Sequence, residues 1–144
     1  MSDTTPRNST AIPQMLADAL LRSLGGTTAM LRVTGANTSS NQAEVGLVST
    51  MLYEVVLGPV AMRRLRPTWK RDEPSQWELL VSATSVEDQV SILDLPSAQS
   101  LFSMTLGVSV AGQDYLIESV ASNEAFGQTY LYRLILREVR VQAL

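Results

Sequence analysis

The hydrophobic period of this chain changes at Gly25-Gly26, and this change limits the folds that are open to it. Before these glycines, apolar side chains recur every three or four residues, which predicts an amphipathic helix from Pro13 to Leu24. Pro suits the first turn of a helix, and Gly suits its end. After the glycines the period falls to two, which is the spacing of strands with one buried face.

Two strands are expected in the first half of the chain. In the first, residues 27–34, Ala29, Leu31 and Val33 share one face. The turn-rich run GANTSSN, residues 35–41, predicts an exposed hairpin loop. A second strand is expected over residues 44–57 and to be interrupted at Gly58-Pro59, because Pro favours an edge, a bend or a strand end.

The second half predicts four strands and a helical insertion. Residues 76–83 alternate like a half-buried strand, and the insertion runs from Ser85 to Met104, with Ser85 and Ser97 as helix caps. The closing strands are expected over residues 108–111, 115–121 and 129–141. The last strand is apolar on both faces, which is typical of a central strand or of one that lies between a core and a second subunit.

These elements fit one domain. A chain of 144 residues buries roughly two-thirds of the surface that its unfolded form exposes. Residues 1–10 are polar and predict a flexible tail, and residues 11–144 predict a single β-rich domain. The expected fold is mainly β: a small antiparallel β-barrel or sandwich with an N-terminal helix and a short helical insertion.

Missing residue types exclude most catalytic chemistry. The chain has no Cys and no His, so thiolate nucleophiles, Ser-His-Asp triads, and metal sites built from Cys or imidazole are ruled out. The adjacent carboxylates at Asp72-Glu73 and Glu87-Asp88 are best explained as solvated charges. No Gly spacing suits a phosphate-binding loop. We therefore expect no enzyme activity, no metal and no cofactor.

Composition also limits the partners. Hydrophobic residues make up 45% and charged residues 17% of the chain, which indicates either a rich core or an apolar surface covered by a partner. The polar start and the absence of an apolar run of about 20 residues predict a cytoplasmic protein without membrane contact.

Residues 63–74, RRLRPTWKRDEP, predict a long exposed basic loop, in a chain whose net charge is -3. Its Arg and Lys side chains could contact phosphates while Trp69 stacks on a base. Alternatively, the loop is a solvated connection, or its Arg side chains pair with acids of a neighbouring copy, and we favour these two explanations over nucleic-acid binding. The candidate partner or DNA-channel contacts are Arg63, Arg64, Arg66, Trp69, Lys70 and Arg71. For Trp77, Tyr115, Tyr130 and Tyr132, the strand periodicity favours packing over ligand binding.

The closing series LGVSVAGQDYLIESVASNEAFGQTYLYRLILREV carries a family resemblance. A strand at Val108 to Val110 enters a turn at Gly112, an aromatic-x-Ile strand with Tyr115 and Ile117 leaves it, and a Leu-rich strand follows over 131–138. This order resembles the C-terminal half of small tailed-phage head-closure proteins, which are also called stoppers or head-tail joining proteins. The residues from Gln76 to Met104 match more loosely, and the first half departs from the family pattern.

The resemblance implies a non-enzymatic virion protein. Several copies would form a homo-oligomeric ring below the portal and adaptor, close the DNA-filled head and offer a platform for the tail. The ring would be assembled in the host cytoplasm, belong to the virion neck or tail region, and be passed by genomic DNA. A negatively charged ring suits that passage. A channel or gating element would be either the basic loop or the insertion, whose candidate residues are Val86, Glu87, Asp88 and Val90.

Two other functions stay open at this stage. A tail terminator, or another small β-rich tail or baseplate protein, would form a similar ring on the tail tube. A nucleic-acid-binding β-barrel would use the basic loop and Trp69.

Overall fold

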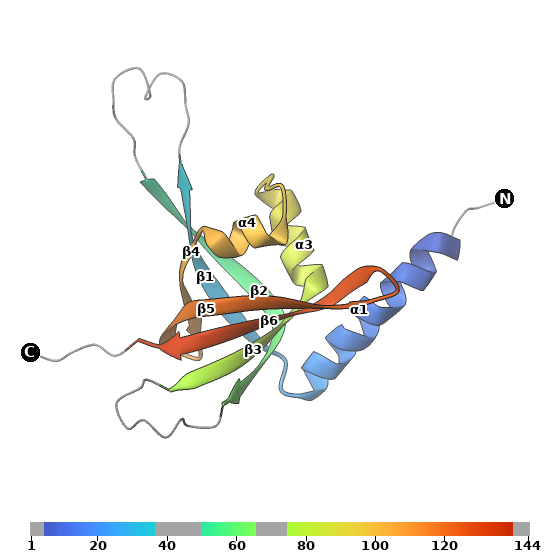
Figure 1. The fold of residues 1–144 in the computed structure, drawn as a ribbon, viewed down its shortest axis with the longest axis horizontal. Helices are drawn as coiled ribbons and strands as arrows, with labels where there is room; N and C mark the ends of the chain where they lie inside the picture. Colours follow the sequence, from blue (N-terminus) through green and yellow to red (C-terminus); the bar gives the residue numbers. More distant parts are fainter. Residues whose placement is uncertain (1–4, 37–49, 66–74, 140–144) are drawn as a thin grey trace, which may run out of the picture.

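A computed structural model describes residues 5–36, 50–65 and 75–139 of the chain. They form a closed barrel of antiparallel strands in the order β1-β2-β3-β6-β5-β4, with helix α1 outside it and helices α3 and α4 between β3 and β4 (Figure 1). The elements are α1 (Thr5–Ser23), β1 (Thr27–Ala36), β2 (Thr50–Arg64), β3 (Gln76–Ser82), α3 (Ala83–Ile92), α4 (Ala98–Ser103), β4 (Thr105–Val110), β5 (Gln113–Ala125) and β6 (Gln128–Glu138). The predicted fold class is confirmed, and the barrel is the form it takes.

Alternate residues of the strands point into the barrel and form its core. Ala29, Leu31 and Val33 of β1 are buried, as their shared spacing predicts. The helical insertion adds Val86 from α3 and Leu101 from α4 to the same cluster. Each fully buried aliphatic side chain contributes about 1.5–3 kcal/mol by leaving water, so this cluster is the main source of stability.

Two tight hairpins connect the last three strands. Ala111-Gly112 joins β4 to β5, and Phe126-Gly127 joins β5 to β6. All four residues have positive φ, from 50° at Ala111 to 81° at Gly112. Positive φ at both central residues matches the right-handed twist of the flanking strands, and Gly adopts it at least cost. Phe126 holds this conformation without that advantage.

The two short helices begin at Ser caps. Ser97 Oγ accepts a hydrogen bond from Ser100 N at 3.2 Å, which confirms the predicted cap of α4. The predicted cap of α3 was wrong, because Ser82 Oγ accepts from Ser85 N and the helix begins at Ala83. Ser85 Oγ instead accepts a hydrogen bond from Gly58 N at 3.0 Å.

Two other predicted boundaries were wrong. Helix α1 begins at Thr5 and Pro13 lies inside it, whereas the sequence predicted a start at Pro13. The helix therefore overlaps the expected tail of residues 1–10, whose residues 1–4 lie outside the described residues. The composition of that tail weighed against a helix, yet Ser, Thr and Asn cost only tenths of a kcal/mol each relative to Ala. Strand β2 continues through Gly58-Pro59. Its register with β1 shifts at these residues, and its pairing with β3 begins at Val60. Pro is tolerated at such an irregularity because its missing N–H breaks no regular ladder.

The basic loop was also placed too early, because Arg63 and Arg64 belong to β2. They pair across the sheet with Glu78 and Trp77 of β3. The loop residues Arg66, Trp69, Lys70 and Arg71, the expected strand over 44–49 and most of the loop at 35–41 lie outside the described residues.

A cavity in the core at a buried position of β3 should strongly lower the free energy of unfolding. Replacing the wholly buried Leu79 by Ala should lower the free energy of unfolding by about 2–5 kcal/mol. Leu52→Ala on β2 is the matched control, since 63% of Leu52 is exposed and its loss should cost less than about 0.5 kcal/mol. Urea unfolding followed by circular dichroism measures both, and equal losses would contradict the described packing.

Candidate functional site

Helix α1 turns its wider apolar face away from the barrel. Ala17 and Leu21 are the residues that pack inward, and Leu21 is only 1% exposed. The outward side chains include Leu16, which is 66% exposed, and Leu20, which is 60% exposed. Large apolar side chains also lie exposed at Ile12 and Met15 of the same helix and at Leu24, which directly follows it. An exposed apolar stripe of this kind is a candidate contact surface.

Polar contacts hold α1 in this orientation. Asp18 Oδ1 accepts a hydrogen bond from Ser82 Oγ at 2.6 Å, and Gln14 Nε2 donates to the Thr129 carbonyl at 3.1 Å. Gln14 also lies 3.3 Å from both carboxylate oxygens of Glu87 on α3. These side chains tie the polar face of the helix to the barrel and leave its apolar stripe outside.

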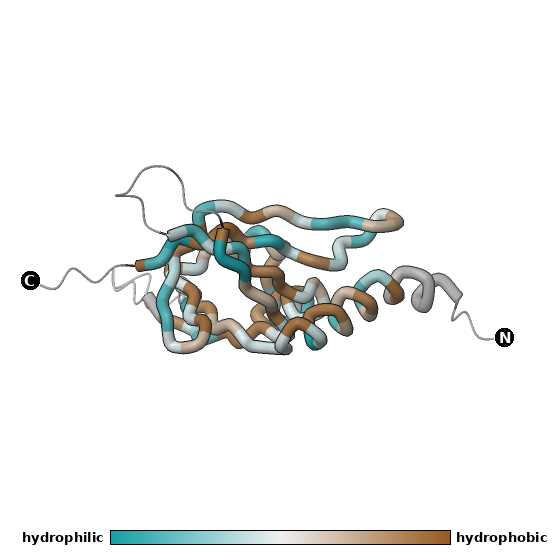
Figure 2. Tube along the Cα trace, turned by 90° about the horizontal axis from the view of Figure 1, so that it is seen from below, coloured by the Kyte–Doolittle hydropathy of each residue, from teal (hydrophilic) through white to brown (hydrophobic). Residues whose placement is uncertain are grey.

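The β5–β6 hairpin extends past the barrel and lies over α1 (Figures 1 and 2). Beyond Leu131, which pairs with Ser82, the residues of β6 that lead to the turn have no partner in β3. At the tip of the hairpin, Phe126 is 91% exposed. A bulky aromatic residue that is both in the left-handed region and open to solvent is costly for an isolated chain.

An apolar groove of about 380 Å³ separates the helix from the hairpin. No charged side chain from the part of the chain that the structure describes lines it. We call it the helix–hairpin groove, and its lining residues are Ile12, Pro13, Leu16, Ala17, Leu20, Leu21, Leu80, Ala125, Phe126, Tyr130 and Leu131. Among the described residues that line it, one phenol is the only acid, base or nucleophile, so the groove is suited to docking an apolar group.

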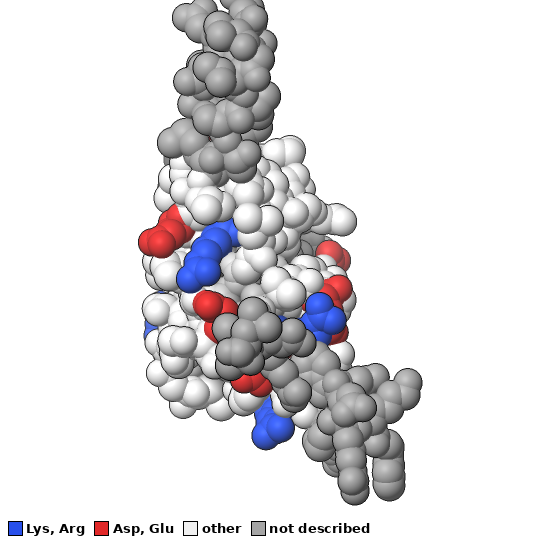
Figure 3. All heavy atoms as spheres, turned by 90° about the vertical axis from the view of Figure 1, so that its left-hand side faces the viewer, with Lys and Arg blue, Asp and Glu red and all other residues white. Residues whose placement is uncertain are grey.

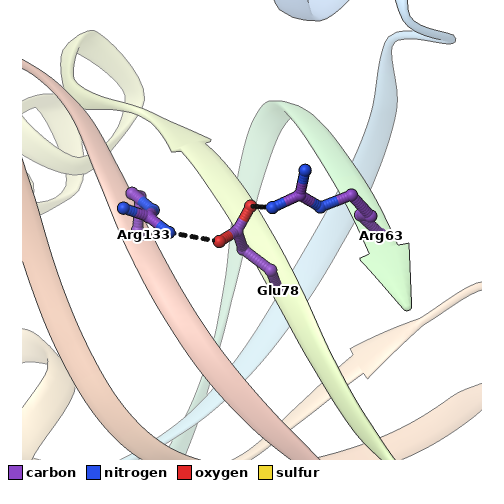
Figure 4. A network of polar contacts seen from close by, with 3 residues as sticks. All are labelled: Arg63, Glu78 and Arg133. Atoms are coloured by element: carbon purple, nitrogen blue, oxygen red, sulfur yellow. Dashed lines mark hydrogen bonds and ion pairs between the residues drawn. The ribbon is translucent and has the colours of Figure 1, made fainter. Parts of the chain in front are cut away.

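Outside the groove lining, the carboxylate of Glu78 lies between two guanidinium groups, those of Arg63 and Arg133 (Figure 4). Glu78 of β3 is 3% exposed, and its two oxygens accept from Arg63 at 2.9 Å and from Arg133 of β6 at 2.5 Å. Both Arg side chains stay partly open to solvent. Arg63 therefore acts as a partner of Glu78 within the chain, which reduces its availability to an outside phosphate.

The other predicted site residues that the structure describes lie on β2 and α3. Arg64 donates to Ser75 Oγ at 3.1 Å. In α3, Val86 is wholly buried and Val90 packs against the core, while Glu87 and Asp88 are exposed. The structure does not bring these residues together with Arg63 and Arg64 into one cluster. Their predicted role in a channel stays a prediction.

The charges of the described residues are interspersed. Figure 3 shows acidic and basic side chains side by side on one face, without a continuous basic area among its coloured atoms. The described residues contain no group of three or more acidic side chains placed to hold a metal ion. None of the helices in the described ranges has the length and hydropathy needed to span a membrane.

Four aromatic side chains pack in two pairs. Packing was predicted from strand periodicity for three of them, Trp77, Tyr115 and Tyr132, and the fourth is Phe102. The rings of Trp77 and Tyr115 meet edge to face with centroids 6.1 Å apart, and those of Phe102 and Tyr132 at 5.5 Å. Burial raises the pKa of the Tyr132 phenol, and the nearby charge of Glu87 raises it further. Burial also raises the pKa of Tyr115, with a smaller contribution from Glu138.

The exposed stripe of α1, the Phe126 tip and the burial of Glu78 were not predicted from the sequence. Of these features, only the burial of Glu78 could have been suspected from the sequence. A lone carboxylate on a predicted strand needs cationic neighbours if it is buried. Its partners come from strands that are far apart in the chain. No family model, curated protein or solved structure matches this chain.

In the Glu78 network, loss of an Arg partner should cost more stability than loss of Glu78 itself. Arg133→Met leaves the buried carboxylate with one partner and should lower the free energy of unfolding by about 1–3 kcal/mol. Glu78→Met removes the buried charge, and both Arg side chains can turn to water, so we expect a change below about 1 kcal/mol. Urea unfolding of the two variants tests this order, and a larger loss for Glu78→Met would contradict it.

The raised pKa values of Tyr115 and Tyr132 predict a loss of stability at high pH. In the unfolded chain both phenols ionise near pH 10.0, whereas in the fold they stay neutral to higher pH. Their contribution is therefore complete below about pH 10 and is lost as the pH rises through the folded pKa. Urea unfolding at about pH 8 and at about pH 11 should show a smaller loss for Tyr132→Phe than for the unmodified chain.

Proposed function

We propose that this chain is a structural protein of the tailed-phage neck, where it forms a homo-oligomeric ring that closes the DNA-filled head and joins it to the tail. The observation that carries the proposal is the apolar surface made by α1 and the tip of the β5–β6 hairpin. The setting in the neck comes from the resemblance of the closing strands to head-closure proteins.

The chemistry of this surface favours a protein partner. Between Ile12 and Leu24, α1 has only two charged residues, Asp18 and Arg22. Helices that lie on membranes are rich in Lys and Arg on their polar face, and nucleic acid requires clustered cations. An uncharged stripe with Met, Leu and Phe matches the core of a protein–protein interface.

The same surface suits contact between copies. Each copy offers a protruding aromatic tip at Phe126 and an apolar groove beside it. When the tip of one copy contacts the groove of the next, the contact is heterologous, and heterologous contacts generate rings if the rotation closes. The described cations favour this function over a nucleic-acid-binding barrel, because Arg63 and Arg64 already have partners within the chain.

The proposal predicts that the apolar stripe drives assembly. The double variant Leu16→Gln, Leu20→Gln should weaken self-association at least about tenfold, because it removes more than about 1.4 kcal/mol of apolar burial at the interface. Both side chains are exposed in the single copy, so the fold should persist. Light scattering coupled to gel filtration gives the mass, and electron microscopy shows whether the assembly is a ring.

Ile92→Gln is the matched control. Ile92 is 72% exposed on α3, away from the groove lining, and its replacement should leave the mass unchanged. A chain that stays monomeric up to its highest soluble concentration, or that assembles equally well without Leu16 and Leu20, would contradict the proposed mode of assembly. Portal, capsid and tail genes beside the coding sequence would support the neck setting.

A further inference from the structure

The β5–β6 hairpin, which projects past the barrel, carries at its tip a side chain that contributes little to the fold of its own copy (Figure 1). Phe126 is 91% exposed, so it buries almost no apolar surface within the described chain. Its φ of 54° lies in the left-handed region, which is unfavourable for a bulky residue. The matching position of the β4–β5 hairpin holds the small Ala111, at a φ of 50°. A costly residue at an exposed position indicates a contact outside its own copy.

The helix–hairpin groove has room for such a side chain. Its volume is about 380 Å³, whereas a closed cavity of about 150 Å³ is enough to hold a benzene ring. Phe126 of the same copy is among the lining residues, yet its exposure shows that its ring does not fill the groove. Leu16, Leu20 and Leu131 offer apolar walls that would bury a phenyl ring from a second copy.

An excess positive charge lies beside the groove. Leu80 lines the groove and also a smaller hollow of about 260 Å³, whose lining includes Arg63 and Glu78. Arg133 pairs with Leu80 across the sheet. We call Arg63 and Arg133 the guanidinium pair. The carboxylate of Glu78 balances only one of their two charges, and both Arg side chains stay partly open to solvent.

The tip of the hairpin carries the opposite charge. Glu124 lies two residues before Phe126, is exposed, and has no ion-pair partner among the described residues. On the receiving side, Arg133 lies two residues after the groove residue Leu131 on the same face of β6. Two residues of a strand span roughly 6–7 Å, so the two spacings are alike. A tip whose phenyl ring lies against Leu131 therefore brings Glu124 close to the guanidinium pair.

We propose that Phe126 of one copy anchors in the helix–hairpin groove of the next copy, and that Glu124 beside it pairs with the guanidinium pair there. The inference rests on the proposed self-assembly and names the side chains that decide which two surfaces meet. The buried ring supplies affinity, and the charges fix the direction in which the tip enters. Because tip and groove are different surfaces, each copy gives one contact and receives one.

Phe126→Gly removes the anchor and keeps the turn, because Gly is favoured at positive φ. Self-association should weaken at least about tenfold, since the phenyl ring no longer leaves water at the contact. The matched control is Ala111→Gly, which makes the same kind of change at the other hairpin and should leave the mass unchanged. Light scattering coupled to gel filtration measures both. An unchanged mass for Phe126→Gly would overturn the inference.

A mixture of two defective variants tests whether the tip meets the groove. Phe126→Gly lacks the tip but keeps the groove, whereas the double variant Leu16→Gln, Leu20→Gln keeps the tip but has a damaged groove. The protein concentration is set so that the unmodified chain assembles and neither variant does so alone. The equimolar mixture should then form a complex with one copy of each variant and nothing larger, because one tip and one groove remain. Apolar stripes that pack directly against each other would give no such complex and would contradict the inference.

The charge contact is tested by reversing one of its members. Glu124→Lys should weaken self-association about threefold or more, because repulsion from the guanidinium pair replaces attraction. Glu54→Lys makes an equal change of charge on β2 and should have a smaller effect. In the background of Arg63→Gln the excess positive charge is gone, so Glu124→Lys should then have little effect. Equal effects of the two Lys variants, or an unchanged effect of Glu124→Lys in that background, would contradict the charge contact.

The mass of the unmodified chain separates this inference from the proposed function. If the variants and their mixture behave as expected but the unmodified chain stops at two copies, tips and grooves are exchanged reciprocally. The tip contact then stands and the proposed ring fails. If the unmodified chain forms rings that need Leu16 and Leu20 but not Phe126, the proposed function stands and this inference fails.

Discussion

The ladder between β5 and β6 is the interaction on which the rest of the structure depends. At one end it closes the barrel, where Tyr115 pairs with Glu138 beside the short ladder to β4. At the other end the two strands pair with each other alone and project over α1. The projecting half forms one wall of the helix–hairpin groove and also carries Phe126 at its tip. Both parts of the proposed contact therefore follow from strands that are longer than the barrel requires.

Much of this fold could be predicted from local sequence patterns. The period of two identified the buried face of β1, and the cap at Ser97 identified α4, because both signals involve residues close together in the chain. The errors arose where distant residues decide the outcome. Pro59 would interrupt a regular strand ladder, and the sequence alone therefore predicts a break. In the fold, however, Pro59 lies where β2 changes its pairing partner from β1 to β3, so the strand continues. Ser85 resembles a cap until Gly58 supplies a different hydrogen bond.

The candidate site was less predictable than the fold. The 3.6-residue period of α1 shows that it has an apolar face, but it does not show which way that face turns. Ala17 and Leu21 make the narrower stripe, and they pack inward because Asp18 and Gln14 beside them find partners on β3, α3 and β6. The buried position of Glu78 likewise depends on Arg63 and Arg133, which only the register of three strands brings together. Nothing in the sequence alone reveals these registers.

The hydroxyl of Ser82 has a further consequence. It caps α3 by accepting from Ser85 N, and at the same time it donates to Asp18 on α1. One oxygen atom thus joins the helix that carries the exposed apolar stripe to the first turn of the helical insertion. A partner that shifts α1 must stretch this bond or carry the start of α3 with it. Contact on the outside of the barrel is in this way mechanically coupled to the helices that cover the end of its core.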